Sequence, residues 1–387
     1  MINDPDVSNS QSRWSVYGFH WRMRDAWIST DPAFEAAPVA QTMLSIWNQY
    51  LAPLATNAIR FHINIYSSQQ VTGCDPSITR LISLCRFAQA QNIRLIPIFA
   101  GSGKFSSGKE REFGPKVEHF VGGFLDRLVQ AGLSHLYARI AAWQIEDEMN
   151  HFIRHAGWAE NVYTEMLIDA AQRVRRAERQ HGAVQCADRM VIFPADMMFF
   201  KAFLKRPWQY VPAMLRQQRF DYTVPGDLTA FVACPDIEII GVDMYPGLYA
   251  PLATVDTFLW LVRRLCAEYG AATRYGKKIL VAEAGCPTWP SSRRREERQL
   301  RFFQDLLCSL TSFDRTGGRE SGFLGLLWYC FNDQHIKFML WPPQEWRFGV
   351  VKTVPGNEWF ATNPSDPKLV WYWLRDIAEH GSGRGAP

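Results

Sequence analysis

The sequence predicts an α/β fold of the (β/α)8 TIM-barrel type, formed by a single domain with loop insertions. Short apolar runs rich in β-branched and aromatic residues alternate with longer stretches of helical periodicity, a pattern typical of parallel strands joined by crossover helices. Eight runs and eight helical stretches occur, which is the count of a closed barrel. The first strand-to-helix turn, HWRMRDAW, lacks the glycines that a doubly wound nucleotide-binding sheet requires, so that alternative is disfavoured.

Each predicted strand is a short and almost uninterrupted apolar run, as expected when both faces of a parallel strand are buried. In chain order the runs are WSVYGFHW (14–21), NAIRFHINI (57–65), IRLIPIF (93–99), RIAAWQI (139–145), RMVIFP (189–194), IEIIGVD (237–243), KILVAE (278–283) and FLGLLWYCF (323–331).

The stretches between these runs show the spacing of amphipathic helices. They lie near 38–54, 76–91, 116–132, 160–181, 201–218, 255–274, 293–312 and 367–379. The longest insertion, 195–236, is expected to cover the barrel mouth. We therefore expect an N-terminal extension at 1–13, a (β/α)8 barrel at 14–380 and a flexible tail, GSGRGAP, at 381–387.

Composition limits the classes of function. With 47% hydrophobic and 21% charged residues the chain is an ordinary globular protein, and a net charge of +4 does not indicate a nucleic-acid partner. The arginine clusters at 173–179 and 293–295 are interpreted as solvated helix faces. No leader-like segment and no run of about eighteen apolar residues occurs, and the eight cysteines form no close pairs, so we expect a cytoplasmic protein with reduced thiols and no membrane partner.

Two glutamates stand where predicted strands end, and active sites of α/β barrels lie at that edge. Glu148 follows the fourth strand in AAWQIEDEMNHF, and Glu283 ends the seventh in ILVAEAGCPTW. These strands face each other across a barrel. Cleavage of a glycosidic bond with retention needs two carboxyl groups about 5–5.5 Å apart, one protonating the leaving oxygen and the other attacking the anomeric carbon.

Together with these glutamates, three further residues resemble the pattern of clan A of the retaining glycoside hydrolases, and the resemblance spans nearly the whole chain. It implies that Glu148 is the acid/base and Glu283 the nucleophile. It also implies that Arg60, in NAIRFHINIY, and Tyr245, in IIGVDMYPGLY, support the nucleophile, and that Trp328, in GLLWYCFND, floors the sugar subsite. The expected substrate is a β-linked oligosaccharide or glycoside, with no cofactor.

One residue departs from this pattern, because Asp147 precedes the acid/base where the clan ordinarily has asparagine. A carboxylate accepts hydrogen bonds but, when ionised, cannot donate one to a substrate hydroxyl. Three interpretations stay open: Asp147 pairs with a cationic 2-amino sugar, as in exo-glucosaminidases of the clan, it accepts from an ordinary hydroxyl, or it marks a site without activity. Repulsion from Asp147 would help to keep Glu148 protonated.

Four other residues near the predicted mouth are candidate sugar contacts: His20, Trp21, His62 and Trp289. No metal site is expected, because the histidines lack a zinc-binding pattern. A catalytically silent glycan-binding barrel is the main alternative function. A lyase or aldolase is a third, although no strand displays the Schiff-base lysine or metal cluster that such barrels often need. The sequence does not fix the sugar, the linkage or the oligomeric state.

Overall fold

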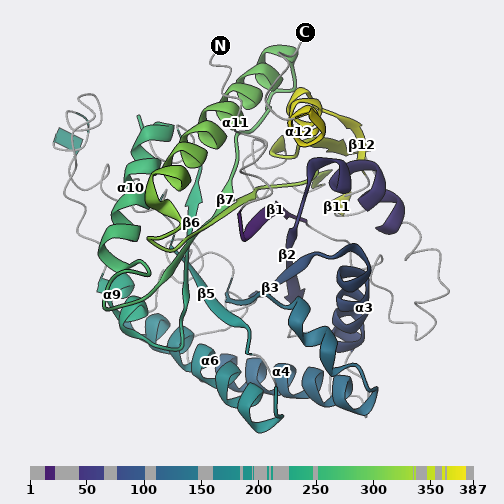
Figure 1. The fold of residues 1–387 in the computed structure, drawn as a ribbon, viewed down its shortest axis with the longest axis vertical. Helices are drawn as coiled ribbons and strands as arrows, with labels where there is room; N and C mark the ends of the chain where they lie inside the picture. The colour runs from purple at the N-terminus through teal and green to yellow at the C-terminus, as the bar shows by residue number, and fades with distance from the viewer. Residues whose placement is uncertain are drawn as a thin grey trace.

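In the computed structural model, eight parallel strands close into a barrel in sequence order, surrounded by helices (Figure 1). The predicted (β/α)8 fold is confirmed. The structure describes residues 14–21, 43–64, 76–100, 110–146, 160–183, 186–193, 195, 207–208, 211, 226–246, 252–333, 335–336, 347–353, 360–361 and 364–380.

The barrel strands overlap all eight predicted runs. They are β1 (Val16–His20), β2 (Ala58–Asn64), β3 (Arg94–Ala100), β4 (Ala142–Ile145), β5 (Asp188–Phe193), β6 (Ile239–Met244), β7 (Lys278–Ala284) and β8 (Phe323–Trp328). The barrel closes where β1 pairs in parallel with β8, with Gly18 opposite Leu327. The eighth strand ends earlier than the predicted residue 331.

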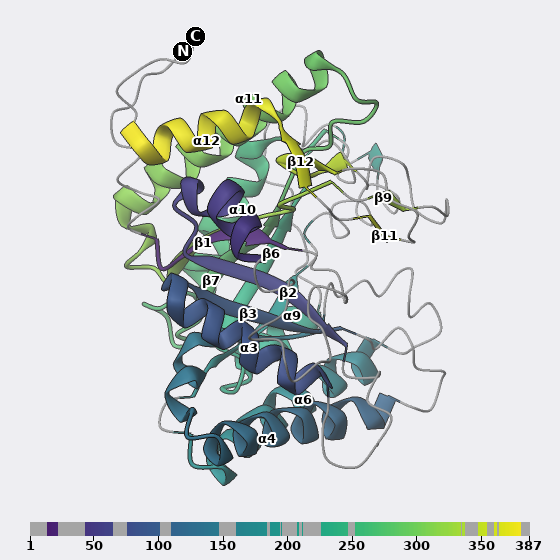
Figure 2. The same ribbon diagram turned by 90° about the vertical axis from the view of Figure 1, so that its right-hand side faces the viewer.

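Helices cover the outside of the barrel, as Figure 2 shows from the side. They are α3 (Pro76–Gln91), α4 (Phe113–Gln130), α6 (Glu160–Gln180), α9 (Gly226–Ala233), α10 (Val255–Tyr269), α11 (Arg293–Phe313) and α12 (Leu369–His380). Shorter turns are η3 (Trp47–Leu51), η4 (Ala52–Leu54), η6 (Glu110–Glu112), η7 (Ser134–Arg139) and η8 (Asp314–Gly318). No helix in the described ranges has the length and apolar character needed to cross a membrane.

One of the predicted helices differs from the structure, and another lies mostly outside the described residues. The stretch at 38–54 is described from residue 43, and after one α-helical turn it continues as the π and 3-10 turns η3 and η4. Pro53 has no backbone N–H to donate within an α-helix, and Ala55 ends the segment in the left-handed conformation with φ 54°. The stretch at 201–218 lies mostly outside the described residues, and the helix described before β6 is α9.

The C-terminal part adds two small sheets to the barrel. Strand β9 (His335–Ile336) pairs with β11 (Phe360–Ala361), and β10 (Val351–Thr353) pairs with β12 (Pro364–Pro367). Lys368, directly before α12, is buried and donates from Nζ to Asp333 Oδ1 at 2.7 Å and to Thr288 Oγ1 at 2.9 Å. This ion pair fixes the start of α12 to the loops beyond β7 and β8.

Successive side chains of a strand point to opposite faces, so the apolar residues of the strands form one layer inside the barrel and one layer outside it. Inward-facing residues such as Val16, Ala58, Ala142 and Leu327 fill the barrel interior as one cluster. Their neighbours along the strands belong to a much larger cluster that also contains residues of the surrounding helices. The same two-residue period continues along β1, β2 and β4 from the inner apolar layer to polar side chains, and these polar side chains form the candidate site.

Candidate active site

Glu283 lies near the end of β7, and 2% of its surface is exposed. The pairing of β7 with β6 shifts by one residue just before it, so that Asp243 lies opposite Glu283 whereas Val242 lies opposite Val281. An irregularity of this kind can re-aim a side chain at the rim of a barrel. Here the Glu283 carboxylate contacts residues of both β2 and the segment after β6.

Both oxygens of the Glu283 carboxylate accept a hydrogen bond, one from β2 and one from the residue that follows β6. Arg60, on β2, donates from Nη1 to Oε1, and Tyr245, just after β6, donates from its hydroxyl to Oε2. Arg60 is fully buried and Tyr245 nearly so. A guanidinium and a phenol donating to the two oxygens favour the ionised carboxylate and fix its orientation. The structure thus brings together the three residues that the sequence assigned to the nucleophile and its support.

Two histidines extend this network along the inner wall. His20 Nδ1 lies 2.8 Å from Arg60 Nη1 and 3.6 Å from Glu283 Oε1, and its Nε2 lies 3.2 Å from His62 Nδ1. A neutral His20 satisfies both hydrogen bonds by accepting at Nδ1 and donating from Nε2. Burial and the Arg60 charge lower the pKa of His20 to about 3. His20 therefore stays neutral beside Arg60, and a contact of His20 or His62 with a sugar stays a prediction.

Gln144, on β4, links Arg60 to the segment that precedes the predicted acid/base. Its Oε1 accepts from Arg60 Nε at 2.6 Å, and its Nε2 donates to the backbone carbonyl of Glu146 at 2.9 Å. Glu146 is buried and adopts a left-handed conformation with φ 67°. Such a conformation costs a non-glycine residue about 1–3 kcal/mol and is often found at functional sites. Gln144 was not predicted from the sequence, because its partners Arg60 and Glu146 approach it only in the folded barrel.

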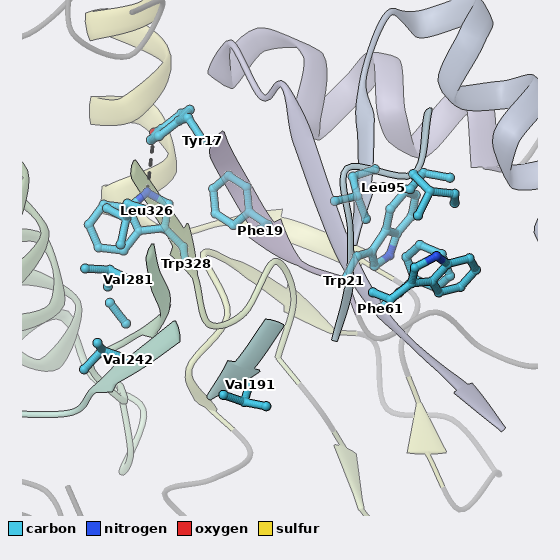
Figure 3. Packing of buried hydrophobic residues seen from close by; sticks show 14 of the residues in the cluster. Tyr17, Phe19, Trp21, Phe61, Leu95, Val191, Val242, Val281, Leu326 and Trp328 are labelled. Carbon is cyan, nitrogen blue, oxygen red and sulfur yellow. Dashed lines mark hydrogen bonds between the residues drawn. The ribbon is translucent and has the colours of Figure 1, made fainter. Parts of the chain in front are cut away.

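Trp328, the last residue of β8, and Trp21, directly after β1, belong to the apolar layer outside the barrel and not to the interior where a contact with sugar was predicted. Trp328 is fully buried, stacks on Phe303 of α11 with ring centroids 3.8 Å apart, and directs Nε1 to the Tyr17 hydroxyl (Figure 3). Trp21 is fully buried in the same outer layer against Phe331. The prediction that these two tryptophans bind substrate is therefore corrected: both are core residues between the barrel and its surroundings.

Tyr329, directly after β8, is the aromatic residue that lies at the site. It is two positions beyond Leu327, which faces the barrel interior. Its ring centroid lies 5.4 Å from that of His20, 5.7 Å from that of Tyr245 and 5.4 Å from that of Phe348. Tyr329 is therefore part of the wall beside Glu283. Because Leu327 faces the barrel interior, Tyr329, two residues later, lies on the same side, and Trp328 lies on the other.

The other predicted site residues are Trp289, which is described, and Asp147 and Glu148, which are not. Trp289 follows β7 and is 43% exposed, so a ligand could reach its ring. Asp147 and Glu148 lie outside the described residues. Their roles remain predictions, as does the spacing of the two catalytic carboxyl groups.

Metal and thiol chemistry receive no support from the residues that are described. Among them, no group of three or more His, Cys, Asp or Glu side chains could hold a metal ion. Seven cysteines are described, and no disulfide bond joins any two of them. Burial raises the pKa of the Cys286 thiol, three residues after Glu283, which keeps the thiol in its less nucleophilic form.

Comparison with known proteins supports the fold. No family model and no curated protein sequence matches this chain. Among solved structures, a family 1 β-glucosidase from Thermotoga maritima superposes with a TM-score of 0.58 at 11% identity, covering 90% of this chain and 87% of that chain. The same enzyme in complex with galacto-hydroximolactam gives a TM-score of 0.60 at 12% identity, with 91% and 88% coverage.

A third structure, the AHE enzyme from Alicyclobacillus herbarius, gives a TM-score of 0.57 at 13% identity, covering 89% of this chain and 86% of that chain. At these identities the likeness establishes a shared (β/α)8 architecture and leaves function to the residues of the site.

Proposed function

We propose that this protein is a retaining glycoside hydrolase that cleaves β-linked oligosaccharides or glycosides by double displacement. The observation that carries the proposal is the Glu283 carboxylate at the carboxyl end of the barrel, held by Arg60 on one oxygen and Tyr245 on the other. A buried carboxylate with two fixed donors is suited to attack an electrophilic carbon without first having to be oriented. The β-glucosidases with the same architecture are consistent with this function.

In the proposed reaction, Glu283 attacks the anomeric carbon while Glu148 protonates the departing glycosidic oxygen. The bond to the leaving group breaks and a glycosyl ester forms on Glu283. Glu148 then removes a proton from a water molecule, which attacks the anomeric carbon and releases Glu283. An acceptor alcohol in place of water would give transglycosylation by the same steps.

Arg60 must also hold its position throughout the proposed reaction. When Glu283 forms the ester, the carboxylate loses its negative charge, and the guanidinium must keep its place through both steps. Gln144 Oε1 accepts from Arg60 Nε, and His20 Nδ1 accepts from Nη1, the same nitrogen that donates to Glu283. The guanidinium therefore keeps two hydrogen bonds when the Glu283 charge is lost. A neutral His20 serves this purpose because it adds no second positive charge beside Arg60.

Asp147 bears on the choice of sugar. It precedes the proposed acid/base and offers a carboxylate where an amide would donate to the 2-hydroxyl. A 2-amino sugar, whose ammonium group donates, would complement this carboxylate. Preference for a glucosaminide over the matching glucoside, lost in Asp147→Asn, would support that interpretation.

The test is hydrolysis of aryl β-glycosides (glucoside, galactoside, mannoside, xyloside and glucosaminide) by wild type and by Glu283→Gln. Glu297→Gln, an exposed glutamate on α11, is the matched control. We expect turnover by the wild type and by the control, and a loss of several orders of magnitude in Glu283→Gln. Turnover that survives in Glu283→Gln would contradict the proposal, and saturable oligosaccharide binding without any hydrolysis would favour the glycan-binding barrel.

A further inference from the structure

The first turns of α11 carry a concentration of arginines that the candidate site does not use. Arg294, Arg298 and Arg301 are exposed and follow one another at helical spacing, and Arg295 lies beside them, partly exposed. Among the described residues, these four arginines line a hollow of about 340 Å³. Figure 2 shows α11 on the outside of the molecule next to α12.

These four guanidinium groups lack carboxylate partners in the described part of the chain, although two glutamates lie in the same helical segment. Glu296 is engaged by Lys352 Nζ at 3.1 Å and by the backbone N–H of Leu369. Glu297 lies 3.6 Å from Arg293, which is outside the hollow. Among the described residues, neither of these glutamates therefore forms an ion pair with an arginine of the hollow.

This arrangement is unfavourable for the helix itself. Cations in the first turn oppose the helix dipole, and like charges three or four residues apart repel each other by about 0.2–0.5 kcal/mol per pair. Arg294, Arg295 and Arg301 are all at such spacings from Arg298. A bound anion would remove this repulsion, and the helix N-terminus would add to the attraction.

We propose that this hollow is a binding site for a small anion that carries phosphate groups, separate from the candidate active site. Planar guanidinium groups match phosphate oxygens in pairs of parallel hydrogen bonds, and several arginines together suit a ligand with more than one negative charge. A volume of about 340 Å³ is at the lower end for small-ligand pockets, so one small phosphate ester or a pyrophosphate fits it better than a polymer.

The hollow lies on α11, outside the barrel, whereas Glu283 lies on β7. Gln299, on the buried side of the same turns, donates to the backbone carbonyls of Cys286 at 2.9 Å and Phe348 at 3.1 Å. Arg294, Arg298 and Arg301 therefore lie on the exposed side of a helix whose inner side supports the loop after β7. An anion bound there would be a second ligand, distinct from a substrate at Glu283.

The test is calorimetric titration of the full chain with inorganic pyrophosphate at low, fixed ionic strength, for wild type, Arg298→Gln and Arg293→Gln. Arg293→Gln is the matched control, because it removes the same charge from the same turns outside the hollow. We expect saturable binding that Arg298→Gln weakens about ten- to hundredfold, as for the loss of a charge-assisted hydrogen-bonding group, while Arg293→Gln has little effect.

Absence of saturable binding to wild type, or equal weakening by both substitutions, would overturn the proposal. Binding of anionic vesicles or of a short oligonucleotide at these arginines that pyrophosphate cannot displace would also overturn it. This experiment measures anion binding and not hydrolysis. A lack of anion binding would therefore leave the proposed glycosidase function untouched, and a lack of hydrolysis would leave the proposed anion site untouched.

Discussion

Replacement of His20 by asparagine is expected to remove a large pH dependence from the stability of the fold. His20 is fully buried, and burial together with the Arg60 charge lowers its pKa from 6.5 to about 3 in the folded protein. Asparagine cannot titrate in this range, and its side-chain oxygen can still accept from Arg60.

The direction and size of the effect follow from linkage. Between pH 6.5 and pH 3 the unfolded chain binds a proton at His20 and the folded chain does not, so stability present above pH 6.5 is lost as the pH falls. From pH 7 to pH 5 this loss is about 2 kcal/mol, set almost entirely by the unfolded-state value. The result is therefore insensitive to the folded-state pKa as long as that value lies well below 5.

Urea unfolding at pH 7 and pH 5 measures this difference. Wild type should lose about 2 kcal/mol more than His20→Asn over this interval, while His119→Asn, at an exposed position on α4, should keep the wild-type dependence. NMR of the histidine rings supplies a direct check, because the His20 signals should not titrate between these pH values. Titration of His20 near pH 6.5, or equal losses in wild type and His20→Asn, would refute the neutral, buried assignment.

Three further changes test other parts of the structure. Gln144→Leu removes the acceptor for Arg60 Nε and should cost about 1–3 kcal/mol of unfolding free energy and lower kcat more than it changes KM; a change in KM alone would contradict a positioning role. Trp328→Ala should destabilise the fold by about 3–5 kcal/mol in thermal unfolding, whereas exposed Trp289→Ala should alter stability by less than about 0.5 kcal/mol; the reverse order would contradict their placement. Lys368→Met removes the nearer of two cations from the buried Asp333 carboxylate and leaves Arg347 Nη1 3.5 Å from its Oδ2. It should cost about 3 kcal/mol, measured by urea unfolding; a neutral effect would show that the Lys368–Asp333 pair does not hold α12.

The barrel could be predicted from the sequence because its signals are local. Each strand is a compact apolar run bounded by helical periodicity, as in KILVAE before Glu283, and such alternation admits few architectures. Glu283 stood out because it is a polar residue at the end of an apolar run, where active sites of α/β barrels lie. Arg60 and Tyr245 were assigned only through the resemblance to a known clan. Their mutual contacts were inferred through the resemblance to a known clan, and the geometry agrees with that inference.

The sequence could not predict in the same way which face of a strand each aromatic side chain occupies. In strands buried on both sides, apolar residues occupy inner and outer positions alike, so the composition of FLGLLWYCF does not indicate whether Trp328 or Tyr329 faces the site. The register of β8 against β1 decides it, and that register depends on closure of the whole barrel. Gln144 was missed for a similar reason, because its partners Arg60 and Glu146 come together only when β2 and β4 are held across the barrel interior.

The most direct test of the central claim is to trap the reaction with a 2-deoxy-2-fluoro glycoside that bears a good leaving group, using the sugar preferred in the aryl glycoside panel. The fluorine slows both steps, while the reactive leaving group lets the covalent intermediate accumulate. Proteolysis and mass spectrometry should then find one sugar on the peptide that contains Glu283, and none in Glu283→Gln. Labelling of a different residue, or hydrolysis with inversion and no adduct, would contradict Glu283 as the nucleophile.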